Sequence, residues 1–206
     1  ASAYLKELRT LQPRGPYYLS GYCGGGWIAF EMASRLRAAG EEVALLALLD
    51  SYGPNMRRTN PRVEKWVQGT LRDGIRFIVG KVQARVRRDY ASISHAIRVR
   101  YYRWTGQPVP YELRDLWLTQ AFLGAAAGYK PQPYEGKVTL LLARDVEAPE
   151  GAKQSQFGWH GLVPAGLEVF EVPGTHHTLT HNPNAAELAS TLLRCMAPSR
   201  ASLSDR

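Results

Sequence analysis

The stretch GYCGGG, residues 21–26, decides how the rest of the sequence is interpreted. An apolar run precedes it and a helical pattern follows it, so the chain turns sharply from a predicted strand into a predicted helix. Glycine two positions before and two positions after the central residue is the pattern of a nucleophile elbow, which displays the central side chain, here Cys23, at the start of the helix. A phosphate-binding turn or a plain tight connection is the alternative. The lysine of a P-loop and the spacing of a dinucleotide fingerprint are both missing.

Outward from this stretch, short apolar runs alternate with helical patterns. Strands are predicted over 16–22, 43–50, 137–145 and 167–174, and helices over 2–12, 24–39, 111–129 and 184–196. Strands that are apolar along most of their length and alternate with helices indicate a parallel sheet covered on both faces. The predicted fold class is therefore α/β, with an irregular tail after Met196.

A long segment, about 55–130, interrupts this alternation after the second strand. Residues 57–103 hold 13 Lys and Arg against three acids, a net charge of +10. This exceeds the formal charge of +8 of the whole chain. Insertions of this length commonly serve as lids over active sites. A basic surface on a nearly neutral body favours an acidic partner and does not by itself indicate nucleic acid. A solvated outer face of the lid is the alternative.

Composition narrows the class of protein further. With 206 residues and 45% hydrophobic content, the chain is long enough for one domain with a core. No apolar run approaches the roughly 20 residues of a membrane span, and the first ten residues lack the apolar core of a signal peptide. The two cysteines, Cys23 and Cys195, lie far apart, and no metal-ligand spacing is present. We expect a cytoplasmic protein with reduced thiols and no metal.

Two acids and a histidine follow predicted strands. Asp50 and Asp145 each end a strand, and His176 follows the last strand in the sequence PGTH. In a parallel sheet the carboxyl ends of all strands face one crevice, so these side chains should approach Cys23. The order nucleophile, acid, histidine is that of α/β-hydrolases, and we favour Asp50 over Asp145 as the acid. The N–H of Gly24, at the helix start, is placed to donate to an oxyanion.

Two long segments carry a family resemblance. Residues 15–54, with the LLDSY turn, and residues 158–189, with the VPGTH histidine, resemble the thioesterase domains that end nonribosomal peptide synthetases and polyketide synthases. Those domains have the α/β-hydrolase fold, with a mostly parallel sheet and a helical lid insertion. The resemblance therefore implies a single thioesterase domain over 1–206, with its lid at about 55–130.

The resemblance also implies an activity. A peptidyl or polyketide chain would arrive as a thioester on the 4′-phosphopantetheine of a carrier protein, and the domain itself would bind no cofactor. Cys23 would be the nucleophile, Asp50 the acid and His176 the base. Hydrolysis would release an acid, and cyclisation would release a lactone or lactam. Arg87 and Arg88 are the residues that we expect at the carrier-docking surface. An editing type II thioesterase and a non-catalytic module that binds acyl chains or carriers are the alternatives.

The sequence departs from the family pattern in two ways. Serine usually stands where this chain has Cys23, and both a natural cysteine and a cysteine engineered from serine fit the sequence. The resemblance begins in the helix before the nucleophile strand, so we expect the earlier strands and the second oxyanion donor to lie outside this chain. Residues 1–206 would then be the C-terminal part of the fold, and its N-terminal part would be a further partner that covers an apolar strand edge.

Overall fold

The computed structural model divides the chain into two compact units. One comprises Ala1–Arg58 and Pro131–Arg206, and the other comprises Thr59–Lys130. The structure describes residues 1–56, 94, 97–102, 104–146 and 148–204.

The second unit contains helix α4, Tyr111–Ala127, which falls within the helix predicted over 111–129. Most of the basic segment lies outside the described residues, and so do both arginines expected at the docking surface, Arg87 and Arg88.

Within the described ranges, no helix is long and apolar enough to cross a membrane.

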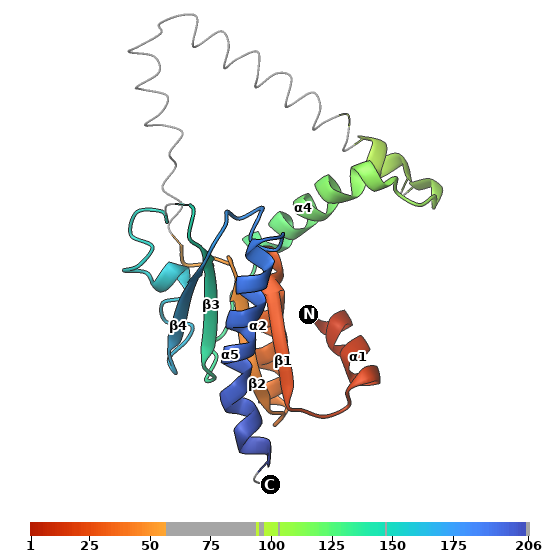
Figure 1. Cartoon of the computed structure of the whole chain (residues 1–206). Helices are drawn as coiled ribbons and strands as arrows, with labels where there is room; N and C mark the ends of the chain where they lie inside the picture. Colours follow the sequence, from red (N-terminus) through yellow and green to blue (C-terminus); the bar gives the residue numbers. More distant parts are fainter. Residues whose placement is uncertain (57–93, 95–96, 103, 147, 205–206) are drawn as a thin grey trace, which may run out of the picture. The chain divides into compact units, whose positions relative to one another are not determined.

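The first unit is built on one parallel sheet with the strand order β1-β2-β3-β4 (Figure 1). The strands are β1 Tyr17–Tyr22, β2 Val43–Leu49, β3 Val138–Ala143 and β4 Leu167–Val172. Tyr22 pairs with Leu49, which pairs in turn with Leu141, and Ala143 pairs with Val172. The carboxyl ends of all four strands therefore lie at one edge of the sheet. The predicted α/β class is confirmed.

Helices α2 and α5 cover opposite faces of this sheet. Helix α2 spans Gly24–Ala38 and α5 spans Asn184–Ser204. Consecutive residues of β3, Leu140 and Leu141, point to opposite faces and belong to different buried clusters. Phe30 of α2 packs in the cluster of Leu140, and Leu188 of α5 packs in the cluster of Leu141. Figure 1 shows the sheet between the two helices.

The connection from β3 to β4 completes the core on the α2 face. It contains a single 3₁₀ turn, η1, over Gln156–Gly158. Trp159, directly after the turn, is fully buried, and its ring lies 4.9 Å from that of Phe30. A loop can close this face because one large aromatic side chain fills the space between strand and helix.

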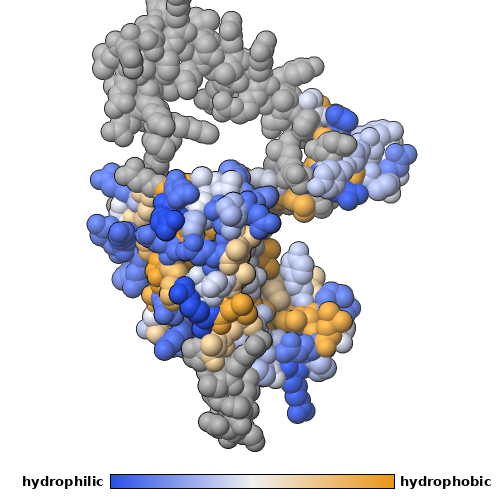
Figure 2. Space-filling view, in the orientation of Figure 1, coloured by the Kyte–Doolittle hydropathy of each residue, from blue (hydrophilic) through white to orange (hydrophobic). Residues whose placement is uncertain are grey.

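Helix α1, Ser2–Leu11, buries less of its surface than its apolar spacing suggests. Only Leu5 is buried, whereas Tyr4 and Leu11 are 60% and 86% exposed. Figure 2 shows the resulting apolar patch over this helix. Among the described elements α1 packs against α2, and contact with one helix covers only a narrow stripe.

The predicted irregular tail after Met196 is wrong, because α5 continues to Ser204. Extending an existing helix requires no new nucleation, which allows α5 to continue through this stretch although it contains Pro198.

Candidate active site

The turn between β1 and α2 holds Cys23 in an unusual backbone conformation, with φ 52° and ψ −125°. Its N–H donates to the carbonyl oxygen of Leu49 at 2.9 Å, which ties the turn to the end of β2. The residue is exposed. A non-glycine residue with positive φ costs about 1–3 kcal/mol and persists where its surroundings impose it. The turn has the geometry of the predicted elbow, with the thiol displayed at the N-terminus of α2.

Close contacts, one with backbone and one with a side chain, explain two of the glycines around this turn. A Cβ at Gly21 would lie 2.2 Å from the carbonyl oxygen of Gly25, and a Cβ at Gly26 would lie 2.2 Å from Oγ of Ser51. A Cβ at Gly25 would meet nothing within 4 Å. The elbow pattern has its second glycine two positions after the cysteine, at Gly25. The close contact lies instead at the third position, Gly26, because that position of α2 faces the residue that follows Asp50.

Asp50 lies directly after β2 and is buried, with only 7% of its surface exposed. Its Oδ1 accepts a hydrogen bond from the N–H of Ala143 at 3.1 Å. Its Oδ2 lies 2.5 Å from Nδ1 of His176. Both carboxylate oxygens therefore have a partner, and the burial of the group is compensated by these contacts.

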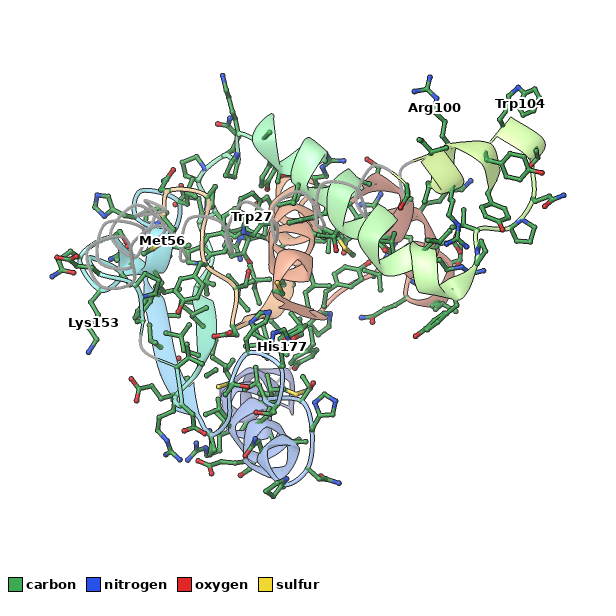
Figure 3. The ribbon with its side chains drawn as sticks, turned by 90° about the horizontal axis from the view of Figure 1, so that it is seen from above. Trp27, Met56, Arg100, Trp104, Lys153 and His177 are labelled. Atoms are coloured by element: carbon green, nitrogen blue, oxygen red, sulfur yellow. The ribbon has the colours of Figure 1, made fainter. Side chains whose placement is uncertain are left out.

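His176 lies in the loop between β4 and α5, and its side chain is 33% exposed. Its ring stacks on that of Tyr22, with centroids 4.9 Å apart and an interplanar angle of 24°. The Tyr22 hydroxyl donates to the carbonyl oxygen of His176. His177 packs edge-on against His176 at 5.3 Å, and Figure 3 shows it in the region between α2 and α5. Because Asp50 engages Nδ1, Nε2 is the nitrogen left for proton transfer.

The other acid considered for this role, Asp145, contacts the backbone before the histidine. Its Oδ2 accepts from the N–H of Gly174 at 2.9 Å, and its own N–H donates to the carbonyl oxygen of Gly174 at 3.0 Å. Gly174 has φ +104°, which favours glycine. The structure thus places Asp50 on the imidazole and Asp145 on the loop that carries His176.

Two indole groups hold the turn that follows Asp50. Nε1 of Trp159 donates to the carbonyl oxygen of Ser51 at 2.9 Å, and Nε1 of Trp27 donates to that of Tyr52 at 2.7 Å. Burial, with a smaller contribution from the nearby Asp50 carboxylate, raises the pKa of Tyr52. These contacts fix the backbone on which the carboxylate stands.

Sequence reasoning overlooked Tyr22 and the two indoles as parts of this site. The available signal for Tyr22 was its position directly before the displayed cysteine. No comparable signal marked Trp27 or Trp159, whose contacts join residues 25 and 108 positions apart.

The second cysteine of the chain is not part of this arrangement. Cys195 lies on α5, away from the elbow, and burial is the main cause that raises its pKa. Within the described ranges, no group of three or more His, Cys, Asp or Glu residues is arranged to hold a metal ion.

A cavity of about 430 Å³ opens beside the carboxyl end of β3. Tyr52, Leu142 and Phe157 contribute aromatic and aliphatic surface, and Lys153 and Glu171 are charged residues of its lining. Figure 3 shows the Lys153 side chain pointing away from the protein. Tyr52, one of its lining residues, follows the buried Asp50 by two positions in the chain.

A family model and several known proteins are similar to this chain. A family model described as "Thioesterase domain" matches residues 1–195. A non-reducing polyketide synthase of Arthrinium sp, atnG, is 30% identical over 216 residues, covering 97% of this chain and 10% of the synthase. A dimodular nonribosomal peptide synthase of Bacillus subtilis is 51% identical over 55 residues, 27% of this chain and 2% of that protein. The chain thus spans a tenth or less of these relatives.

A solved structure is similar over nearly the whole chain. It is the covalent complex of the NocB thioesterase domain with a fluorophosphonate nocardicin G analogue, with a TM-score of 0.59 and 28% identity. The match covers 95% of this chain and 72% of that one.

Proposed function

The chain belongs to the thioesterase domain family, and from that membership we propose that it releases an acyl chain from a carrier-protein thioester through an acyl intermediate on Cys23. The observation that carries the proposal is the contact between the buried Asp50 carboxylate and the His176 ring, at the same sheet edge as the displayed thiol. A nucleophile, a base and a group that orients the base are the parts that such a transfer needs.

The first half-reaction transfers the acyl group to the enzyme. Nε2 of His176 takes the proton of the Cys23 thiol, and the Asp50 carboxylate stabilises the imidazolium that forms. The sulfur attacks the thioester carbonyl, and the N–H of Gly24, the first residue of α2, donates to the developing oxyanion. The tetrahedral intermediate then expels the phosphopantetheine thiolate, which receives the proton from His176.

The second half-reaction releases the product. Water, or a hydroxyl or amine of the acyl chain itself, gives its proton to His176 and attacks the acyl carbonyl, and Cys23 leaves as the thiol. An acyl-cysteine remains a thioester, so it keeps more activation toward a nitrogen nucleophile than an acyl-serine ester would. This favours cyclisation, with hydrolysis as the competing outcome.

The relatives support the choice of substrate class. One relative is a polyketide synthase and another is a nonribosomal peptide synthase, so we propose a polyketide or peptidyl chain carried on phosphopantetheine. The fluorophosphonate complex of the NocB domain supports a covalent intermediate, because that inhibitor is bound covalently there. The cavity beside Tyr52 provides space for an apolar part of the chain.

Intact-protein mass spectrometry tests the proposal. The full chain is mixed with a simple acyl thioester of N-acetylcysteamine, and we expect a mass increase of one acyl group. Cys23→Ser keeps a nucleophilic side chain and should retain a slower adduct, whereas Cys23→Ala should show none. An equal adduct on Cys23→Ala would refute the role of the thiol. Absence of any adduct with Cys23 intact would favour a non-catalytic binding module.

A further inference from the structure

Tyr22 contacts His176 in two separate ways. Its ring stacks on the imidazole at 4.9 Å, and its hydroxyl donates to the carbonyl oxygen of the same histidine. The two residues are 154 positions apart in the chain. Tyr22 is the last residue of β1 and pairs with Leu49, so its backbone is fixed by the sheet.

The histidine itself lacks such support from secondary structure. It stands in a loop, and its hydrogen bond to Asp50 constrains one ring nitrogen. A single hydrogen bond leaves the ring free to rotate about the axis of that bond. The stacked tyrosine ring fixes the plane of the imidazole, and the hydroxyl fixes the backbone from which the imidazole projects.

We propose that Tyr22 is a positioning residue that holds the imidazole of His176 in the orientation needed for proton exchange with Cys23. The inference rests on the proposed function. Loss of about 1 Å in the placement of a reacting group costs about 100-fold in rate, so a side chain that locks the base contributes to catalysis without touching the substrate.

The protonation of the Tyr22 hydroxyl and the electrostatics of its ring fit this role. Burial, together with the nearby Cys23 and Asp50, raises the pKa of Tyr22, so its hydroxyl remains a hydrogen-bond donor in neutral and moderately alkaline solution. The face of an aromatic ring also attracts a cation, which favours the imidazolium formed during proton transfer. Among the described residues, His177 is a further titratable group that contacts His176, besides Asp50 and Tyr22, and its ring lies edge-on at 5.3 Å.

The chain offers a matched control on the same strand. Tyr18 lies four residues earlier on β1, so both side chains point to the same face of the sheet. Its hydroxyl is buried without a hydrogen-bond partner among the described residues. Tyr18→Phe therefore removes a hydroxyl from the same face but breaks no contact with the base.

The experiment compares the full chain with Tyr22→Phe, Tyr22→Leu and Tyr18→Phe. Two rates are measured across pH: acylation of Cys23 by the acyl thioester in single turnover, and alkylation of Cys23 by iodoacetamide. The second rate reports the thiolate and needs no turnover, so it tests Tyr22 even where the proposed acyl transfer fails.

We expect Tyr22→Phe, which keeps the stacked ring, to slow acylation by about fivefold, as for one lost hydrogen bond. Tyr22→Leu should slow it by about 10- to 100-fold. It should also move the acid limb of the alkylation profile to higher pH, because the imidazolium beside the thiolate loses the ring and the alignment with Asp50. Tyr18→Phe should match the unmodified chain. Rates of both Tyr22 variants within twofold of Tyr18→Phe would overturn the inference. So would a slower Tyr22→Leu whose pH profiles are unchanged, since that result indicates a purely structural role.

Discussion

Replacing Asp50 with asparagine should disable the base while leaving the shape of the site intact. The amide oxygen can still accept the hydrogen bond from Ala143, but the NH₂ group then faces Nδ1 of His176, now 2.5 Å from the carboxylate. Nδ1 must become an acceptor, which puts the ring proton on Nε2 and prevents that nitrogen from taking the thiol proton. The change reverses the tautomer of the base.

The expected size of the effect follows from the contact that is lost. A hydrogen bond to a charged group contributes about 1.5–3 kcal/mol, which corresponds to about 10- to 160-fold in rate. The wrong tautomer adds to this loss, and the equivalent change in a serine-protease triad costs about 10⁴-fold. We therefore expect Asp50→Asn to reduce acylation between about 10²- and 10⁴-fold.

Single-turnover acylation followed by intact mass measures this loss, and Asp145→Asn is the control. The Asp145 side chain is 55% exposed, and its asparagine analogue can still accept from Gly174. We expect that variant to stay within about twofold of the unmodified chain. A larger loss in Asp145→Asn than in Asp50→Asn would show that the two acids have been assigned the wrong way round.

Three further outcomes are expected. Gly26→Ala should lower the free energy of unfolding by about 1–3 kcal/mol, because its Cβ would lie 2.2 Å from a buried hydroxyl. Gly25→Ala should be neutral or stabilising, because its Cβ would meet nothing within 4 Å. Thermal melts that rank the two variants in the opposite order would contradict the packing described for the elbow. Charge reversal at Arg87 and Arg88 should slow reaction with a carrier-bound acyl chain and spare a small thioester, and equal losses on both substrates would argue against docking there. Cys195 should react with iodoacetamide more slowly than Cys23 at neutral pH, because its raised pKa keeps it as the thiol. Peptide mapping that finds equal labelling of the two cysteines would contradict this expected difference in rate.

The alternation of strands and helices could be predicted because each apolar run is short and bounded by turn residues. That alternation fixed the parallel sheet, and the sheet brought Asp50 and His176 to one edge although they are 126 positions apart. Topology alone therefore predicts which groups are near each other. The roles assigned to them remain predictions until the variants are measured.

Finer features depend on side-chain contacts that no local pattern encodes. The steric demand falls on Gly26 and not on Gly25 because of the rotational phase of α2 relative to the end of β2. Asp145 contacts Gly174 and not the imidazole because the loop after β4 turns through a residue with positive φ. Such outcomes are set by packing across the sheet, which sequence spacing does not specify.

In the proposed mechanism, the positions of the three reacting groups along the chain have a consequence for biosynthesis. The thiol and the carboxylate come from residues 23 and 50, but the imidazole comes from residue 176 and is held by contacts with the first and second strands. A nascent chain that has reached residue 170 carries a cysteine but has no base to activate it. The proposed acyl transfer can therefore begin only after the last strand has been added and the loop behind it has closed onto the sheet, so a partly made chain cannot be loaded by this route.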